Sequence, residues 1–187
     1  VRRLTDVGQP ARETLHLRPA PLPMVWRRTM EKSHNYALDL EWTGAGADGT
    51  FTYEGYSREH TIRIVGKPDI IATADPAFRG DPAKHNPEDL LLAALAGCHM
   101  LTYLALCARK RILVKSYRDR ATGTMLLTAD GGGRFTEVIL HPEVVVAEEG
   151  MLENARTLHK PAHKYCFIAN SVNFPVLHEP VILLPGY

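Results

Sequence analysis

The sequence has few of the features that mark several common classes of protein. Only three cysteines occur in 187 residues, at positions 98, 107 and 166, and no two of them form a CxxC pair. This excludes a disulfide framework of the secreted kind and a zinc ribbon, so a reducing cytoplasm is the expected location. The net charge of +1 gives no electrostatic footprint for nucleic acid.

Cofactor motifs and long apolar runs are also scarce. Gly131, Gly132 and Gly133 read as a hairpin turn rather than a phosphate loop, and the sequence carries no flavin, haem or nucleotide motif. One apolar segment, 90–108, is just long enough to span a bilayer. It has a histidine and a threonine in its middle and is rich in Ala and Gly, so a membrane span is not expected. No cofactor is expected either, because the cofactor motifs named above are missing.

The first 29 residues differ in composition from the rest. They are rich in Arg and Pro, have little hydrophobic periodicity and lack the apolar core of a signal peptide. We interpret 1–29 as a leader or arm, either dispensable for chemistry or packed on a partner subunit. Residues 30–187 are predicted to form a single domain with a substantial core.

Predicted strands precede the apolar segment. Alternating patterns at 36–42, 51–56 and 59–66 predict a meander of about three strands. The segment 67–84 contains three prolines and is predicted to be a long ordered loop, which in a compact domain is often functional.

A second group of elements follows it. Strands are predicted at 114–128 and 134–147, joined by a Gly-rich turn, and at 181–185. Between them, 151–164 is predicted to be helical and broken or kinked by Pro161. The order of strands, helix, strands, helix and strand indicates an α+β fold.

The segment 85–111 is the clearest single element. It begins with a good N-cap, Asn86, then a proline and two acidic residues that suit the start of a helix, and it ends in basic residues. Residues 90–106 are apolar on every face, which is typical of a helix surrounded by protein. A long buried helix is therefore predicted.

Small residues gather on part of this helix. They allow a second helix to approach closely, and one partner that fits is the same helix in a second subunit. The small residues are Ala93, Ala94, Ala96 and Gly97.

Cys98 lies in the middle of the predicted helix, where a free cysteine most often serves packing. Cys107 is nine positions further on, which puts it on the opposite face, so these two thiols cannot pair. A reactive thiolate at Cys98 would need a positive charge from elsewhere in the chain, because burial alone raises the pKa of a thiol.

Cys166 is the other cysteine of interest, because it follows two histidines one helical turn apart. His159, His163 and Cys166 could form part of a zinc site. Pro161 spoils the helical geometry and no fourth ligand is evident, so no metal is expected. The alternatives are histidines that make structural hydrogen bonds, and a peroxide-reducing thiol pair formed by Cys98 and Cys166.

The segment NPEDLLLAALAGCHM, together with AHKYC, closely resembles the OsmC/Ohr family of thiol-dependent peroxidases. GYSREHTIRI and ADPAFRGD are similar to one OsmC-like branch. The resemblance covers roughly 36–184. It implies an OsmC-like α+β fold, with antiparallel sheets and a long buried central helix, and an intertwined homodimer.

The same resemblance implies an antioxidant enzyme that reduces alkyl or fatty-acid hydroperoxides without a cofactor. Cys98 would attack the O–O bond and become a sulfenic acid, and Cys166 would form a disulfide with it. Glu88 matches the family glutamate, and Arg58 is the candidate for the arginine that activates the thiol, with Arg79 as the alternative. A dithiol, dihydrolipoyl for some members, would be the reductant.

Helix geometry constrains this site independently. Glu88 and Cys98 are ten residues apart, which separates them by about 15 Å along a straight helix. Either the helix is interrupted between them, or an antiparallel two-fold pair brings Glu88 of one subunit beside Cys98 of the other. The small residues fit the second arrangement, so we expect active sites at a dimer interface.

Other residues have roles that the resemblance leaves open. Apolar side chains at Leu95, Met100 and Phe167 are predicted to line the substrate pocket. The best-known members have proline where Phe167 follows the second cysteine. Cys107 and His99 are predicted to be packed or hydrogen-bonded. A non-catalytic protein on the same scaffold, which senses redox state or holds a small apolar ligand, is the competing hypothesis.

Overall fold

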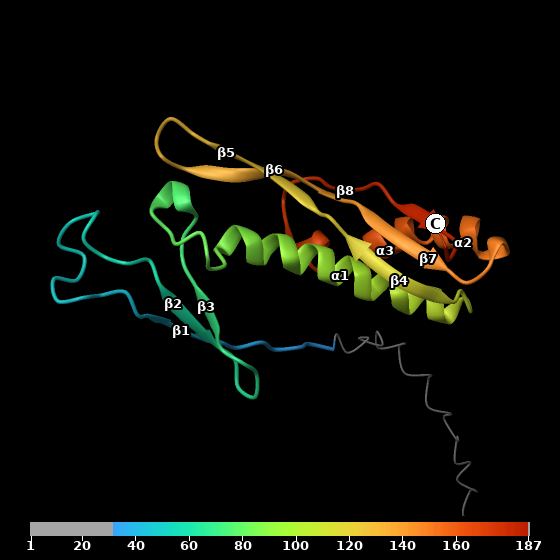
Figure 1. Ribbon diagram of the computed structural model, residues 1–187, viewed down its shortest axis with the longest axis horizontal. Coiled ribbons are helices and arrows are strands. Elements are labelled where there is room, and N and C mark those ends of the chain that lie inside the picture. The colour runs from blue at the N-terminus through green and yellow to red at the C-terminus, as the bar shows by residue number, and fades with distance from the viewer. Residues whose placement is uncertain (1–31, 187) are drawn as a thin grey trace, which may run out of the picture. The chain divides into compact units, whose positions relative to one another are not determined.

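The computed structural model describes residues 32–186, and its compact unit begins at Ala37. The order of elements is strands, one long helix, strands, short helices and strands (Figure 1). The predicted α+β class is therefore confirmed. The predicted leader, 1–29, lies outside the described residues.

A small antiparallel sheet precedes the long helix. It has the order β1-β2-β3, formed by Asp39–Trp42, His60–Arg63 and Ile70–Ala72. The prediction of a strand at 51–56 is wrong, because that segment is a run of bends within the connection between β1 and β2. Leu40 pairs directly with Ile62, which leaves no edge for an intervening strand.

The third strand instead lies inside 67–84, which was predicted to be a loop. β3 pairs with β2 through Ile70 and Ile71, and a short 3-10 helix, η1 (Pro76–Phe78), follows it. The three prolines of the segment fall outside β3, so they do not interrupt its hydrogen bonds.

A long bent hairpin follows the helix, as the sequence predicted. One side is β4 (Val114–Asp119) and β5 (Thr122–Leu127), and the other is β6 (Gly133–Leu140) and β7 (Pro142–Val146). Both sides are interrupted at the same level, where the Asp119 carboxylate accepts a hydrogen bond of 2.8 Å from the backbone N–H of His141.

The small sheet is antiparallel, as predicted, but the two sheets formed after α1 are mixed, which corrects the prediction for that part of the fold. β8 (Val176–His178) runs parallel to β6, and β9 (Val181–Leu183) runs parallel to β7. Parallel neighbours require a crossover connection, and the short helices between β7 and β8 supply it. Side-chain alternation along a strand is the same for either direction, so the sequence pattern could not reveal this.

The crossover consists of four short helices. They are η2 (Glu149–Met151), α2 (Leu152–Thr157), α3 (His159–Tyr165) and η3 (Ala169–Ser171). The predicted break near Pro161 is confirmed, because α2 ends before Leu158 and α3 begins after it. A proline ring clashes with the carbonyl four residues earlier, here that of Thr157.

The long helix α1 (Pro87–Arg109) is unbroken, and it begins with a capping box between Asn86 and Asp89. The prediction that it is buried on every face is wrong for the single chain. Its buried residues form one stripe at four-residue spacing: Leu95, His99, Tyr103 and Cys107.

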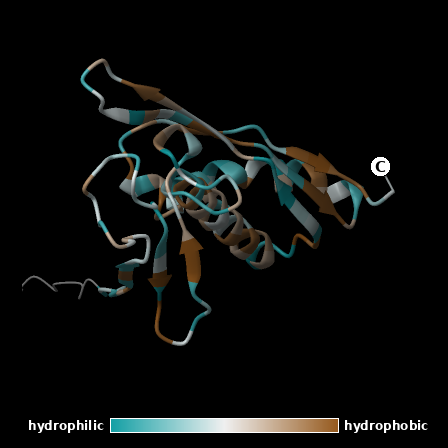
Figure 2. Ribbon diagram, turned by 60° about the vertical axis from the view of Figure 1, so that its left-hand side comes forward, coloured by the Kyte–Doolittle hydropathy of each residue, from teal (hydrophilic) through white to brown (hydrophobic). Residues whose placement is uncertain are grey.

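The opposite face of α1 is left exposed. Leu101 is 64% exposed, and the alanines near it are also accessible. The helix is long and apolar enough to cross a membrane by length and composition, but its buried stripe belongs to the protein core. Figure 2 shows hydrophobic residues along α1 and on strands of the small sheet.

Two core clusters use this stripe. The first surrounds Tyr103, Cys107 and Val144, and the second surrounds Leu95 and Val138. Cys107 is therefore a core residue, as predicted. The stripe holds α1 against the bent hairpin and the crossover helices.

We expect Asn86→Ala to lower the free energy of unfolding by about 1 kcal/mol. The substitution removes the side-chain oxygen that accepts a 2.8 Å hydrogen bond from the Asp89 N–H. Urea denaturation measures the loss, and Asp48→Ala in an exposed turn is the control. Equal losses in both variants would contradict a role for the capping box.

Candidate functional site

Cys98 and Cys166 come together where α1 meets the end of α3. Cys98 is half-buried on α1, and Cys166 is 1% exposed and directly follows α3. The two thiols lie close enough for Cys98 to raise the pKa of Cys166, and both are free. The structure thus brings together two thiols that are far apart in the sequence.

The two thiols differ in their surroundings. Burial raises the pKa of Cys166 to about 11, and the neighbouring Cys98 thiol adds to the rise. The segment after Cys166 is fixed by Asn170, whose side-chain N–H groups donate to the carbonyls of Lys164 and Cys166, both at 2.9 Å. Cys166 therefore stays protonated at neutral pH, while Cys98 is the more accessible thiol.

Arg58 and Glu88 form the second part of the site. Both line a cavity of about 360 Å³. The walls include the aromatic side chains of Trp42, Tyr56 and Phe78. The lining also includes His60 and Asp75, and a cavity with both aromatic and charged walls suits a ligand that has an apolar body and a polar end.

Arg58 is held by aromatic neighbours. Its guanidinium lies 3.9 Å from the ring centroid of Tyr56 and 4.5 Å from that of Tyr53, and it also donates hydrogen bonds to their backbone carbonyls. Arg79, the alternative, ends η1 with a left-handed φ of 68° and does not line this cavity. Of the two candidates, only Arg58 shares a cavity with Glu88.

Glu88 has an unmet hydrogen-bonding requirement. One carboxylate oxygen, Oε2, is buried and has no hydrogen-bond partner among the described residues. No ion pair joins Glu88 to Arg58 within 4.0 Å in the part of the chain that the structure describes. A buried carboxylate oxygen without a partner is costly, so this position calls for a further donor.

The two parts of the site do not meet within one chain. Since α1 is unbroken, Glu88 and Cys98 are separated by about 15 Å along it. The alternative of an interrupted helix is therefore excluded. Among residues 32–186, the thiol pair and the Arg58–Glu88 cavity therefore lie apart.

The three predicted pocket residues occupy different environments. Leu95 is completely buried in a core cluster with Val138 and Leu140. Met100 is half-buried on α1, and Phe167 is 80% exposed beside Cys166. Of these three predicted pocket residues, Met100 and Phe167 are accessible to a substrate and Leu95 is not.

Sequence reasoning missed a histidine cluster next to the thiols. His99 Nε2 lies 3.0 Å from His159 Nδ1, and both rings are almost completely buried. His178 lies between them and His163, with ring centroids 5.6–6.0 Å apart. The prediction that His99 is packed or hydrogen-bonded is confirmed, and of the alternatives for His159 the structure shows the structural hydrogen bond. The spacing of His159 and His163 was visible in the sequence, but nothing there linked them to His99 or His178.

The histidine cluster has no charged partner to stabilise an added proton. Burial lowers the pKa of His99 to about 4 and that of His159 to about 3, and it also lowers the pKa of His178. Within residues 32–186, no group of three or more His, Cys, Asp or Glu residues is arranged to hold a metal ion. The rings of His99, His159 and His178 are therefore neutral at neutral pH.

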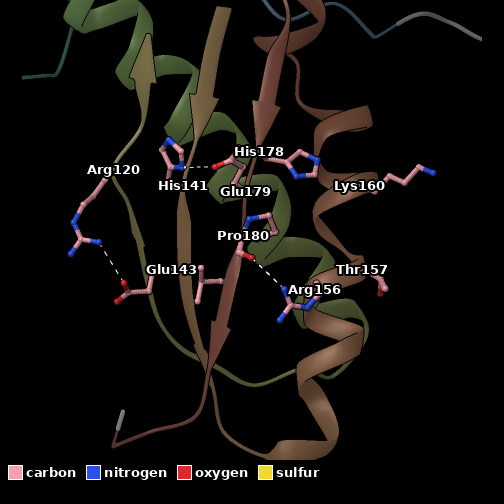
Figure 3. A pocket seen from close by; sticks show the side chains of 10 residues that line it. Arg120, His141, Glu143, Arg156, Thr157, Lys160, His178, Glu179 and Pro180 are labelled. Atoms are coloured by element: carbon pink, nitrogen blue, oxygen red, sulfur yellow. Dashed lines mark hydrogen bonds and ion pairs between the residues drawn. The ribbon is translucent and has the colours of Figure 1, made fainter.

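A larger cavity, of about 720 Å³, opens beside this cluster (Figure 3). Its walls carry ion pairs between Arg120 and Glu143 and between His141 and Glu179. His178 lines this cavity and also contacts the buried rings, so it connects the cluster to the surface.

The fold and the thiol pair define an α+β protein with a dithiol centre on its long central helix. The family model described as OsmC-like protein matches residues 80–179, and the chain belongs to this family. No curated protein matches the chain.

Solved structures agree with this assignment. An OsmC-like protein of unknown function from Vibrio cholerae is 35% identical, with a TM-score of 0.71 over 80% of this chain and 100% of that one. An organic hydroperoxide resistance protein from Elizabethkingia anophelis is 16% identical, with a TM-score of 0.60 over 83% and 99%. One from Legionella pneumophila is 15% identical, with a TM-score of 0.61 over 82% and 99%.

At pH 8 we expect iodoacetamide to modify Cys98 before Cys107 and Cys166. The other two thiols are buried and their pKa values are raised, so they remain protonated and unreactive. Peptide mapping over a time course measures the order, with the unfolded protein in urea as the control. Modification of Cys107 or Cys166 first would contradict this arrangement.

Proposed function

We propose that this protein is a thiol-dependent peroxidase that reduces organic hydroperoxides in a reducing cytoplasm. The observation that carries the proposal is the Cys98–Cys166 pair, an accessible thiol with a buried thiol as its neighbour. Membership of the OsmC-like family supports it. Two proteins that share the fold are described as organic hydroperoxide resistance proteins, which agrees with this chemistry.

The reaction balances without a cofactor. The Cys98 thiolate attacks the terminal oxygen of the hydroperoxide, the O–O bond breaks, and the alcohol leaves as Cys98 becomes a sulfenic acid. Cys166 then attacks the Cys98 sulfur, which releases water and forms the disulfide. A dithiol, such as a dihydrolipoyl group, returns both cysteines to thiols and is itself oxidised to a disulfide.

The accessible surroundings favour an apolar substrate. Phe167 directly follows Cys166 and is exposed, and aromatic side chains line the cavity that contains Arg58 and Glu88. An alkyl or fatty-acid hydroperoxide has an apolar body for these walls and a polar peroxide group for the charged pair.

A homodimer would join the two parts of the site. The uncovered face of α1 includes Leu101, and a side chain at Gly97 would meet open space within the chain. On β1, Leu40 is 60% exposed and Trp42 41% exposed. Antiparallel pairing of two α1 helices would cover such apolar surface and place Glu88 and Arg58 of one subunit beside Cys98 of the other.

Cys98→Ser is expected to lower the rate of cumene hydroperoxide reduction by about a thousandfold or more. Cys166→Ser should consume one equivalent of peroxide and accumulate a sulfenic acid, because the resolving thiol is missing. A coupled assay with excess dithiol measures turnover, and dimedone labelling measures the sulfenic acid.

Cys107→Ser is the matched control for these cysteine variants and should keep its activity within about twofold, since Cys107 lies in the core. A wild-type protein whose thiols all survive peroxide would contradict the proposal. One that oxidises once and does not turn over with excess dithiol would instead be a redox sensor.

Mixing subunits tests where Glu88 acts. We expect Glu88→Gln and Cys98→Ser homodimers each to be poorly active, and a purified heterodimer of the two to recover about half of the wild-type rate. One of its two sites would then combine an intact Cys98 with an intact Glu88 from the other subunit.

A heterodimer of Cys98→Ser with Cys166→Ser is the control and should stay inactive, because both thiols of a site come from one chain. If the first heterodimer fails to recover activity, Glu88 acts within its own chain and the proposed interface site is wrong. A monomer with full activity would also contradict it.

A further inference from the structure

His99 and His159 connect the two helices that carry the thiols. His99 directly follows Cys98 on α1, and His159 is the first residue of α3, whose last turn leads into Cys166. Their rings share a hydrogen bond of 3.0 Å in the interior. Each ring is therefore linked through a short segment of backbone to one of the two thiols.

We propose that His99 and His159 are positioning residues for disulfide formation. Their hydrogen bond, which needs one ring to accept and the other to donate, holds α3 against α1 so that the Cys166 thiol stays beside Cys98. This inference rests on the proposed function, because it concerns the step in which Cys166 reacts at Cys98.

The short helix α3 depends on contacts from the side. It has no side-chain hydrogen bond at its N-terminal cap, and only His159 and Ala162 of its residues are fully buried. Tyr103 of α1 stacks on the His159 ring, with centroids 3.9 Å apart. A ring that both stacks and hydrogen-bonds has a fixed orientation, whereas an apolar side chain at this position could slide along α1.

The histidine pair is not the arrangement that would give the most stable core. His99 Nδ1 and His159 Nε2 are both buried without a hydrogen-bond partner among the described residues. Burying such nitrogens is unfavourable, and apolar residues of similar volume would avoid that cost. A directional contact between α1 and α3 gives the pair a role that core packing does not explain.

The surroundings make this contact sensitive to acid. The groups that face the pair are Tyr103 on α1, His163 on α3, His178 on β8 and Arg156 on α2, and none is a carboxylate. Protons can arrive from the open cavity through His178, which lines it (Figure 3). The ring centroid of His178 lies 5.6 Å from that of His99 and 6.0 Å from that of His159. A proton on either ring would add an uncompensated charge to a buried cluster.

The direction of the pH effect follows. An exposed histidine takes up a proton below about pH 6.5, whereas burial lowers the pKa of His99 to about 4 and that of His159 to about 3. Below pH 6.5 the unfolded chain therefore binds more protons than the folded chain, and stability falls as the pH is lowered toward those values. Contact between α1 and α3 is complete at neutral pH and weakens in acid.

Disulfide closure can be measured without any peroxide. Ellman's reagent, an aromatic disulfide, reacts with Cys98 and releases one thionitrobenzoate, and attack by Cys166 on the mixed disulfide releases a second. The second release reports closure alone. Peptide mapping confirms that Cys98 and Cys166 are joined and that Cys107 stays free.

We expect His159→Phe, which keeps an aromatic ring on Tyr103 but removes the hydrogen bond, to slow the second release by about tenfold or more. The first release should stay within about twofold. His159→Gln, which can still accept or donate, should restore much of the rate. Wild-type closure should slow below about pH 5 more steeply than closure in His159→Phe, because only the wild type has the pair to protonate.

Tyr103→Phe is the matched control, because it keeps the stacked ring and removes only a hydroxyl that has no partner among the described residues. It should close at the wild-type rate. Equal slowing in Tyr103→Phe and His159→Phe, or no slowing in His159→Phe, would overturn the proposal. His99→Phe should match His159→Phe, and the double variant should be no slower than either.

These outcomes remain separate from those of the proposed function. Should wild-type Cys98 fail to react with hydroperoxides, the peroxidase proposal fails, while closure after Ellman's reagent still tests the histidine pair. Should peroxide react normally and His159→Phe close normally, the peroxidase proposal stands and the positioning role is wrong.

Discussion

The unbroken helix α1 is the constraint on which the rest of the site depends. A helix rises 1.5 Å per residue, so its first turn, with Glu88, and its middle, with Cys98, are held apart by about 15 Å. No side-chain movement closes that separation. The chain can cover one stripe of the helix with its own sheets and short helices, and it leaves the opposite stripe exposed. The proposed homodimer would cover this exposed apolar stripe and bring Glu88 of one subunit to Cys98 of the other.

The fold places the buried cysteines Cys107 and Cys166 in different surroundings. Cys107 lies in the core one helical turn after Tyr103, where burial raises its pKa. Cys166 is also buried, but it lies at the end of a short helix and beside Cys98. In the proposed mechanism, the position of α3 relative to α1 is what makes Cys166 a resolving thiol, and the buried histidine pair lies at the contact between these helices.

Several parts of this arrangement were predictable because they depend on neighbouring residues. The N-cap at Asn86, the extent of α1 and the break before Pro161 follow from local backbone chemistry. The prediction of a strand at 51–56 was wrong because alternation is a property of one segment alone. A strand also needs the unpaired edge of another strand to hydrogen-bond with, and β1 pairs directly with β2. The apolar composition of α1 likewise predicted that every face is buried. It could not show which faces are buried by the same chain, and only one stripe is.

The sequence by itself determined the α+β class, the long capped helix with its central cysteine, and the two segments that resemble the OsmC/Ohr family, because each is written in contiguous residues. Only the tertiary structure decided which distant groups meet: Cys98 with Cys166, Arg58 with Glu88 in one cavity, and His99 with His159 in the core. Such contacts depend on how the crossover helices and the loop before β2 pack on α1. That packing is a property of the whole fold, and no local pattern of residues encodes it.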